Sequence, residues 1–444
     1  MKILIAGSGD TGTHLAKMLS SENQDVVLMS TDREYLAGLD SSYNIMVSVG
    51  DAVSVADLCN SGVEDTDLFV AVTPYETINI TACQLAHHLG ARQCVARIES
   101  GCFLDDGIAE MFARSGVSTL IYPESLVAQE LYEYLSKNWM SKWIDLHDGE
   151  LNMTGIKLRE GSPGVGKAIK DLQLEEKYFH IAVIRRNGDL IIPRGDDFLI
   201  KNDTLFIVLK PENLERLAEV AGQERLDAKH IMIAGGGKIT DLLCGMASDE
   251  YDITVIEPDK ERAQMLAEKY SGITVVNAGT RELSVLKEEQ IDKMDIFMAL
   301  TGSDEANIVG CMVAKESGVK RTVAQIEDIS YIGEAENLWI DKVVNKKLIT
   351  SASIIRSVLG SDIKVGNVFS LTDAEVAEIE VHEGSKITKA PVMDLRLPKE
   401  LTLGGMIRHG RGMIIEGRTE LKAGDKVIVI LRTGSLLKAE RLFR

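Results

Sequence analysis

The chain has 444 residues, more than one typical domain holds, and its 45% hydrophobic and 26% charged content is ordinary for a globular protein. Its net charge of −19 argues against duplex nucleic acid or a bare anionic membrane as a partner, because each requires a basic protein face. No apolar run approaches the roughly 20 residues needed to span a bilayer, so direct membrane insertion is not expected.

The first segment, residues 1–135, alternates short apolar strands with helices. Strands are predicted at 1–6, 25–29, 44–49, 68–72 and 93–98, and helices at 11–20 and 77–89. Continuous apolar strands separated by helices indicate a parallel sheet that is covered on both faces.

A glycine-rich turn follows the first strand and has the sequence Gly7-Ser8-Gly9-Asp10-Thr11-Gly12. In a Gly-x-Gly-x-x-Gly turn the first glycine permits the tight bend, the second lets backbone approach a pyrophosphate, and the third lets the helix pack on the strand. The helix N-terminus then attracts the anion. This context predicts nucleotide binding, and the alternative is a turn whose glycines serve packing alone.

The second strand should end in an acid that accepts hydrogen bonds from ribose hydroxyls. Ser30 occupies that place here, and Thr31 and Asp32 follow it. Asp32 either substitutes for the missing acid or caps the next helix, and the sequence leaves both roles open.

Other polar groups follow the later strands. Asp51 comes after the third strand, Thr73 after the fourth, and Arg97 lies in the fifth. An arginine in an apolar strand is costly to bury without an anion, so Arg97 binds either a ligand phosphate or an internal carboxylate.

Residues 140–222 change to period-two patterns with turn signals. Asn187-Gly188 predicts a hairpin between 181–185 and 190–193, and Asn202-Asp203 predicts a turn before a strand at 204–209. This segment is therefore expected to be a small β-rich α+β domain.

The second half repeats the first. Strands are predicted at 230–234, 253–256, 274–276, 296–300 and 322–326, and residues 362–444 repeat the β-rich segment, with Asp425 in the place of Asp203. The order is therefore A-B-A′-B′. The fold class expected is α/β, with two Rossmann-like parallel-sheet domains (1–135 and 229–350), each followed by a β-rich domain (140–222 and 362–444).

The second glycine turn, Gly235-Gly236-Gly237-Lys238-Ile239-Thr240, lacks the third glycine, but a well-placed acid, Glu257, ends the next strand. Lys238 either pairs with a phosphate or is solvated. Gln325 stands where the first half has Arg97. Two sites of unequal affinity or ligand preference follow as a hypothesis.

The two halves also share a further pattern, because Thr73, Glu76 and Asn79 are matched by Thr301, Asp304 and Asn307. At these residues the chain resembles the TrkA family, the cytoplasmic regulatory subunit of bacterial Trk potassium uptake systems. The repeating unit of that family is an RCK (KTN) domain followed by a small companion, and the likeness covers essentially the whole chain.

The resemblance implies two regulatory ligand sites for NAD(H) or ATP/ADP. The first would use the Gly7–Thr11 backbone, Ser30–Asp32, Thr73-Pro74 and Arg97, and the second would use Gly235–Ile239, Glu257 and Thr301. It also implies a homotetramer on the cytoplasmic face of the membrane, bound to a membrane-spanning TrkH-type potassium transporter.

The rival prediction is an NAD-dependent oxidoreductase, since the nucleotide fold alone is shared. The β-rich segments offer only His180 and His409 as candidate proton-transfer groups, so no catalysis is expected. The six cysteines form no Cys-x-x-Cys pair, which favours buried thiols in a reduced cytoplasm over metal ligation.

Overall fold

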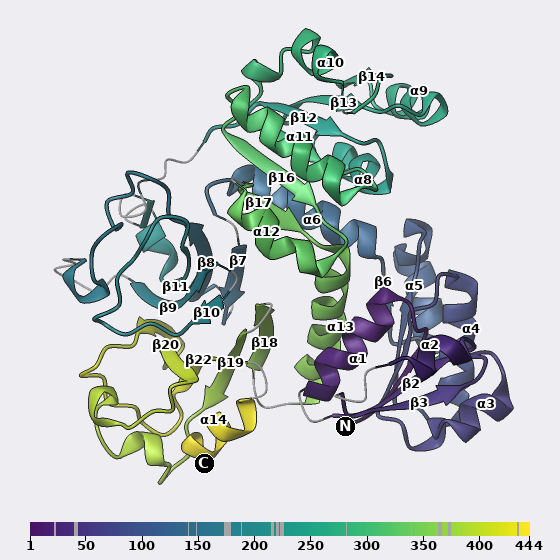
Figure 1. Ribbon diagram of the computed structural model, residues 1–444. Coiled ribbons are helices and arrows are strands. Elements are labelled where there is room, and N and C mark those ends of the chain that lie inside the picture. The colour runs from purple at the N-terminus through teal and green to yellow at the C-terminus, as the bar shows by residue number, and fades with distance from the viewer. Residues whose placement is uncertain are drawn as a thin grey trace. The chain divides into compact units, whose positions relative to one another are not determined.

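A computed structural model describes most of the chain. The residues outside its description are 22–23, 40–42, 141, 148, 173–178, 188, 215–216, 219–221, 223–225, 281, 339, 363–365, 372–373 and 433–434. The chain forms two compact units (Figure 1): Met1–Val127 with Lys346–Ile363, and Ala128–Asn345 with Lys364–Arg444.

The first parallel sheet has the strand order β3-β2-β1-β4-β5-β6. Its strands are β1 Lys2–Ala6, β2 Asp25–Ser30, β3 Ile45–Val49, β4 Leu68–Ala71, β5 Gln93–Arg97 and β6 Thr119–Ile121. The helices of this part of the chain are α1 Asp10–Ser21, α2 Arg33–Ala37, α3 Val55–Asn60, α4 Glu76–Leu89, α5 Asp106–Arg114 and α6 Pro123–Ser136. The order reverses between β1 and β4, which is where an open α/β sheet forms a ligand crevice.

The second parallel sheet repeats this order as β14-β13-β12-β15-β16-β17. Its strands are β12 His230–Ala234, β13 Asp252–Ile256, β14 Ile273–Val276, β15 Ile296–Ala299, β16 Arg321–Gln325 and β17 Lys342–Val344. The helices are α8 Lys238–Ala247, α9 Lys260–Lys269, α10 Leu283–Glu288, α11 Asp304–Glu316, α12 Ile332–Asn337 and α13 Lys346–Asp362. All five strands predicted in each half are present, and the sixth of each sheet was missed because three residues show no periodicity.

The two β-rich segments form five-stranded antiparallel sheets of the same topology, β10-β9-β11-β8-β7 and β18-β19-β22-β20-β21. The first contains β7 Lys142–Leu146, β8 Leu151–Lys157, β9 Phe179–Arg186, β10 Asp189–Ile191 and β11 Thr204–Leu209. The second contains β18 Gly366–Leu371, β19 Ala374–Glu380, β20 Leu401–Arg408, β21 Arg411–Ile414 and β22 Lys426–Arg432, and ends in α14 Leu436–Phe443. These sheets confirm the predicted fold class.

Both predicted turns of the first β-rich segment fall where strands end. Strands β9 and β10 pair as a hairpin, and Asn187 adopts a φ of 51°, while Gly188 lies outside the described residues. Asn202 also adopts a left-handed conformation, with a φ of 70°.

The two β-rich sheets share one hydrophobic core. Leu146, Met153 and Val208 of the first pack with Val376 and Ile430 of the second, and all five side chains are buried. The two β-rich segments therefore form one body within the second unit.

Two helices pack away from the sheet that precedes them in the chain. Helix α13 follows β17 of the second sheet but belongs to the first unit, where Ile354 is fully buried in one core with Leu15 and Leu19 of α1. Helix α6 follows the first sheet but belongs to the second unit from Ala128 onward, where Glu130 pairs with Lys342 of β17 at 2.9 Å. The sequence did not predict this exchange, and the four domain boundaries stay predictions.

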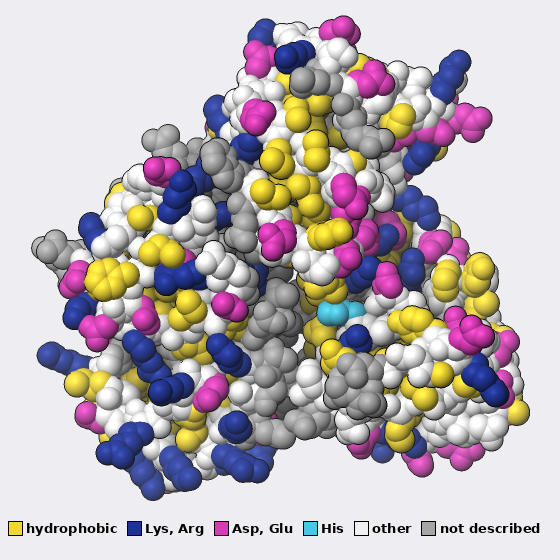
Figure 2. Space-filling view, viewed as in Figure 1, with side chains coloured by type: hydrophobic (Ala, Val, Ile, Leu, Met, Phe, Trp, Pro, Cys, Tyr) yellow, Lys and Arg dark blue, Asp and Glu magenta, His cyan; other side chains and the backbone are white. Residues whose placement is uncertain are grey.

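Charge is unevenly spread along the chain. Figure 2 shows Lys and Arg side chains gathered at the lower left, over the region where Figure 1 draws β20 and β22. The exposed cations in the described part of this last β-rich segment are Lys386, Lys389, Arg396, Lys399, Arg411, Arg418, Lys422, Arg432, Lys438, Arg441 and Arg444. This segment therefore exposes many cations although the net charge of the whole chain is negative. Among the described residues, no helix is both long and apolar enough to cross a membrane.

Each β-rich sheet contains the same buried ion pair ahead of its central strand. Asp203 and Asp425 are almost fully buried, and each accepts two hydrogen bonds from one guanidinium, of Arg186 and Arg408 respectively, at 2.7–2.8 Å. Burial alone would raise the pKa of Asp425. The hydrogen bonds from Arg408 and from the Lys422 backbone outweigh burial and lower that pKa below its usual 3.8.

We expect Asp425→Asn to lower the free energy of unfolding by about 2–4 kcal/mol at neutral pH, because Arg408 loses its charged partner. Since the folded-state pKa is depressed, this stabilisation is present above the unfolded-state value of about 3.8 and is lost as the pH falls through the folded-state value. Urea unfolding of both proteins at pH 7 and pH 3 measures the difference, which should narrow at pH 3. An unchanged difference would contradict the prediction.

Candidate functional site

The first glycine turn joins β1 to α1 at the switch point of the first sheet. A Cβ at Gly7, whose φ is 117°, would lie 2.9 Å from the backbone nitrogen of Thr73, and a Cβ at Gly12 would lie 2.0 Å from the carbonyl oxygen of Gly7. A Cβ at Gly9 would meet nothing within 4 Å. The outer two glycines are therefore required by packing, and the middle one faces open space.

The second turn keeps this arrangement without its third glycine. Gly235 has a φ of 108° and approaches the backbone of Leu300, while a Cβ at Gly237 would again meet nothing within 4 Å. Thr240 takes the place of Gly12, is fully buried, and donates its hydroxyl hydrogen bond to the carbonyl of Gly235. The second turn thus accommodates a side chain at its third position, and the hydroxyl of that side chain gives the Gly235 carbonyl a hydrogen-bond partner.

The ends of the second strands differ between the halves. In the first, the Ser8 hydroxyl donates to the Ser30 hydroxyl at 2.7 Å. In the second, Glu257 is 3% exposed, and its two carboxylate oxygens accept the backbone N–H groups of Gly236 and Asp259 at 2.5 and 2.8 Å. A neutral hydroxyl pair therefore stands where the second half holds a buried carboxylate.

The role of Asp32 follows from its counterpart. Asp32 caps α2 by accepting from the Tyr35 N–H at 2.9 Å, and Asp259 caps α9 by accepting from the Arg262 N–H at 2.9 Å. Asp32 therefore occupies the same capping position as Asp259, and a role for Asp32 at the ribose stays a prediction. Thr31, beside it, is exposed.

One asparagine in each half ties together the ends of two neighbouring strands. Asn79 accepts from the N–H and hydroxyl of Thr73, and donates to the carbonyls of Thr73 and Arg97, all within 3.0 Å. Asn307 makes the same four contacts, with Thr301 and Gln325. Both are almost fully buried. Asn79 and Asn307 belong to the repeated sequence pattern but are not among the residues predicted for the two sites.

Arg97 forms the internal ion pair that the sequence left as one alternative. Its guanidinium donates to Glu99 at 3.1 Å, and its buried Nε has no hydrogen-bond partner among the described residues. Gln325 repeats the contact with Glu327 at 2.9 Å.

The remaining predicted residues lie after strands or in the first turns of helices. Asp51 is exposed and accepts from the Val53 N–H at 3.0 Å, and Pro74 is exposed beside Thr73. Thr11 lies in the first turn of α1. In the second half Lys238 is exposed at the start of α8, and Ile239 is buried. At the edge of the first sheet, Ser8 contacts Ser30, Gly7 approaches Thr73, and Asn79 joins Thr73 to Arg97. At the edge of the second, Glu257 contacts Gly236, and Gly235 approaches Thr301.

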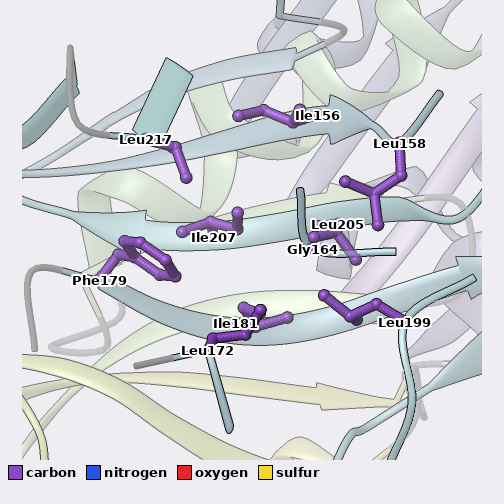
Figure 3. Close-up of a pocket in the computed structure, with 10 residues that line it drawn as sticks. All are labelled: Ile156, Leu158, Gly164, Leu172, Phe179, Ile181, Leu199, Leu205, Ile207 and Leu217. Atoms are coloured by element: carbon purple, nitrogen blue, oxygen red, sulfur yellow. The ribbon is translucent and has the colours of Figure 1, made fainter. Parts of the chain in front are cut away.

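An apolar cavity lies elsewhere, between β8, β9 and β11 of the first β-rich sheet (Figure 3). Its lining consists of Ile156, Leu158, Gly164, Leu172, Phe179, Ile181, Leu199, Leu205, Ile207 and Leu217. The space inside is about 10 Å³, enough for roughly one water molecule. It therefore offers neither the volume nor the polar groups to hold a nucleotide.

The two histidines considered as proton-transfer groups have structural surroundings. The His180 ring lies 3.1 Å from the Thr402 hydroxyl of the second β-rich sheet, and His409 adopts a φ of 53° in the turn between β20 and β21. No cluster of three His, Cys, Asp or Glu side chains that could hold a metal occurs within the described part of the chain.

We expect Gly12→Ala to lower the free energy of unfolding by about 3 kcal/mol or more, because the new methyl group would overlap the Gly7 carbonyl. Gly9→Ala should change it by no more than about 0.5 kcal/mol, since its methyl group meets open space. Urea unfolding of both variants beside the wild type measures the effect. Equal destabilisation by Gly12→Ala and Gly9→Ala would contradict the prediction that only Gly12 is tightly packed.

Two domain families match the chain in alternation. The TrkA-N domain matches residues 3–123 and 231–346, and the TrkA-C domain matches 153–222 and 376–444. Among similar proteins, the Trk system potassium uptake protein TrkA homolog 2 of Methanosarcina mazei is 29% identical over 453 residues, covering 100% of both chains. The Trk system potassium uptake protein TrkA of Vibrio alginolyticus is 30% identical over 442 residues, covering 97% of this chain and 96% of that protein.

Solved structures agree with the fold. The crystal structure of the GsuK RCK domain superposes with a TM-score of 0.61 at 16% identity, covering 100% of this chain and 94% of that one. The GsuK channel bound to NAD gives the same TM-score and identity, covering 100% of this chain and 78% of that one. The chain therefore belongs to the TrkA family, as its resemblance indicated, with two TrkA-N and two TrkA-C domains in alternation.

Proposed function

We propose that this protein is a nucleotide-sensing regulatory subunit of a potassium uptake system. It binds NAD(H) or an adenine nucleotide and controls a membrane-spanning, TrkH-type potassium-conducting partner. The observation that carries this proposal is the end-to-end match of the chain to Trk potassium uptake proteins. Both TrkA-N domains of this chain also have a glycine turn whose middle glycine faces open space.

The geometry of each turn supports an anionic ligand. The first four N–H groups of a helix have no partner within the helix, and they carry the positive end of its dipole. At the start of α1 and α8 the backbone is uncovered, because Gly9 and Gly237 face open space. A pyrophosphate fits this chemistry, and a GsuK structure is described as bound to NAD and another as bound to ADP.

The proposed first site comprises the turn, the end of β2, and the ends of β3 to β5. Its residues are Gly7, Ser8, Gly9, Asp10, Thr11, Gly12, Ser30, Thr31, Asp51, Thr73, Pro74 and Arg97, with Asp32 supporting them as a helix cap. The proposed second site comprises Gly235, Gly236, Gly237, Lys238, Ile239, Glu257 and Thr301. Because only the second has a strand-end carboxylate, we expect it to bind the ribose hydroxyls more strongly.

Regulation by a bound nucleotide requires that the nucleotide have different affinities for two states of the protein. We propose that the nucleotide acts as an unreacted ligand, and that the four domains, bounded near 1–135, 140–222, 229–350 and 362–444, respond to its presence. The working assembly is proposed to be a homotetramer in the cytoplasm, held at the inner face of the membrane by its protein partner.

Calorimetric titration with NAD, NADH, ATP and ADP tests the proposal in the wild type and in Gly9→Trp and Gly237→Trp variants. A side chain at Gly9 or Gly237 would extend into open space, so each tryptophan should block one site without disturbing the fold. We expect saturable binding that each variant reduces by one site, with the nucleotide recovered unchanged.

Two outcomes would contradict the proposal. Absence of binding by all four nucleotides would remove the sensor function. Substrate-dependent conversion of NADH to NAD by the purified protein would favour the rival oxidoreductase.

A further inference from the structure

A cation beside the first glycine turn comes from the second half of the chain. Lys347 lies in the first turn of α13, and its Nζ is 2.6 Å from Oδ2 of Asp10, the first residue of α1. Both residues belong to the first unit. Asp10 stands where the helix N-terminus would receive a phosphate, so the ammonium group lies next to that position.

The two partners differ in how firmly they are held. The Lys347 side chain is 17% exposed, whereas that of Asp10 is 74% exposed. Helix α13 is fixed against α1 by the fully buried Ile354. The lysine is therefore positioned by packing, and the carboxylate can turn into solvent at little cost.

The positive charge of Lys347 also acts on His14, a second residue of α1. Burial, and then the positive charges of Lys17 and Lys347, lower the pKa of His14, one turn beyond Asp10. The buried Nε2 of His14 has no hydrogen-bond partner among the described residues. A neutral imidazole and a partly buried ammonium thus share this helix face, with Asp10 as the anion.

We infer that Lys347 is a phosphate ligand of the first nucleotide site, and that a bound phosphate replaces the Asp10 carboxylate at its ammonium group. The inference rests on the proposed function. A carboxylate and a phosphate at one helix N-terminus repel each other, and a charge-assisted hydrogen bond from a lysine is strong with either. The phosphate, held also by the backbone N–H groups of α1, displaces the exposed and singly held carboxylate.

The second half lacks this arrangement. Lys238 occupies the position that Asp10 has in the first half, so the second turn carries its own cation at the start of its helix. The first site instead obtains a cation from α13 and contains a built-in competitor for it. The two sites should therefore differ in how strongly affinity depends on the charge of the ligand.

The test uses the full chain in a Gly237→Trp background, so that only the first site binds. ADP is titrated by calorimetry, and adenosine is measured by displacement of ADP. With Lys347→Gln we expect ADP to bind at least about 10-fold more weakly and adenosine to be unchanged, because only ADP carries phosphate. With Asp10→Asn we expect ADP to bind several-fold more tightly, because the competitor for Lys347 is gone. Lys346→Gln is the matched control, since Lys346 pairs with Glu124 at 3.2 Å, and should change ADP affinity less than about two-fold.

The double variant Asp10→Asn/Lys347→Gln decides the mechanism. If the phosphate exchanges with Asp10 at Lys347, the gain from Asp10→Asn disappears when Lys347 is absent. An equal gain in both backgrounds, or unchanged ADP affinity in Lys347→Gln, would overturn the inference. Asp10→Asn keeps Lys347, so its result stands even if Lys347→Gln melts at a lower temperature. If neither the wild type nor the Gly237→Trp protein binds ADP, the result counts instead against the proposed function.

Discussion

The site depends on how closely the turn after β1 approaches the end of β4. These strands are neighbours in the sheet, and Gly7 lies so near the Thr73 backbone that no side chain fits between them. Asn79 holds that strand end by bonding Thr73 on one side and the Arg97 carbonyl on the other. A buried amide therefore fixes the backbone at this sheet edge, and Asn307 makes the same contacts in the second half.

The two parallel-sheet domains share this backbone arrangement but differ in the polar side chains at their strand ends. The first pairs two hydroxyls, Ser8 and Ser30, where the second aims the Glu257 carboxylate at the turn. The first also has an ion pair, Arg97–Glu99, where the second has an uncharged amide, Gln325. The strand ends of the two parallel sheets therefore differ in charge, and under the proposed function we expect the two sites to differ in ligand preference or affinity.

Much of the fold could be predicted from the sequence, because buried parallel strands are continuous apolar runs and the duplication repeats each of them. The glycine turns also follow from local backbone geometry. Other features could not be predicted. Strands β6 and β17 have only three residues each, which is too few to show a period. The capping role of Asp32 was recognisable only from the structure, by comparison with Asp259. The Lys347–Asp10 contact joins residues far apart in the chain, and no local pattern encodes such a pair.

The exchange of α13 into the first unit also bears on how the protein is made. Ile354 completes the core around Leu15 and Leu19, yet it is translated on the order of 200 residues after the last strand of that sheet. At typical rates of synthesis the ribosome needs roughly 10 to 40 seconds to add that length. During this interval Leu15 and Leu19 lack the cover that Ile354 gives them, and truncation before residue 346 would remove that cover permanently.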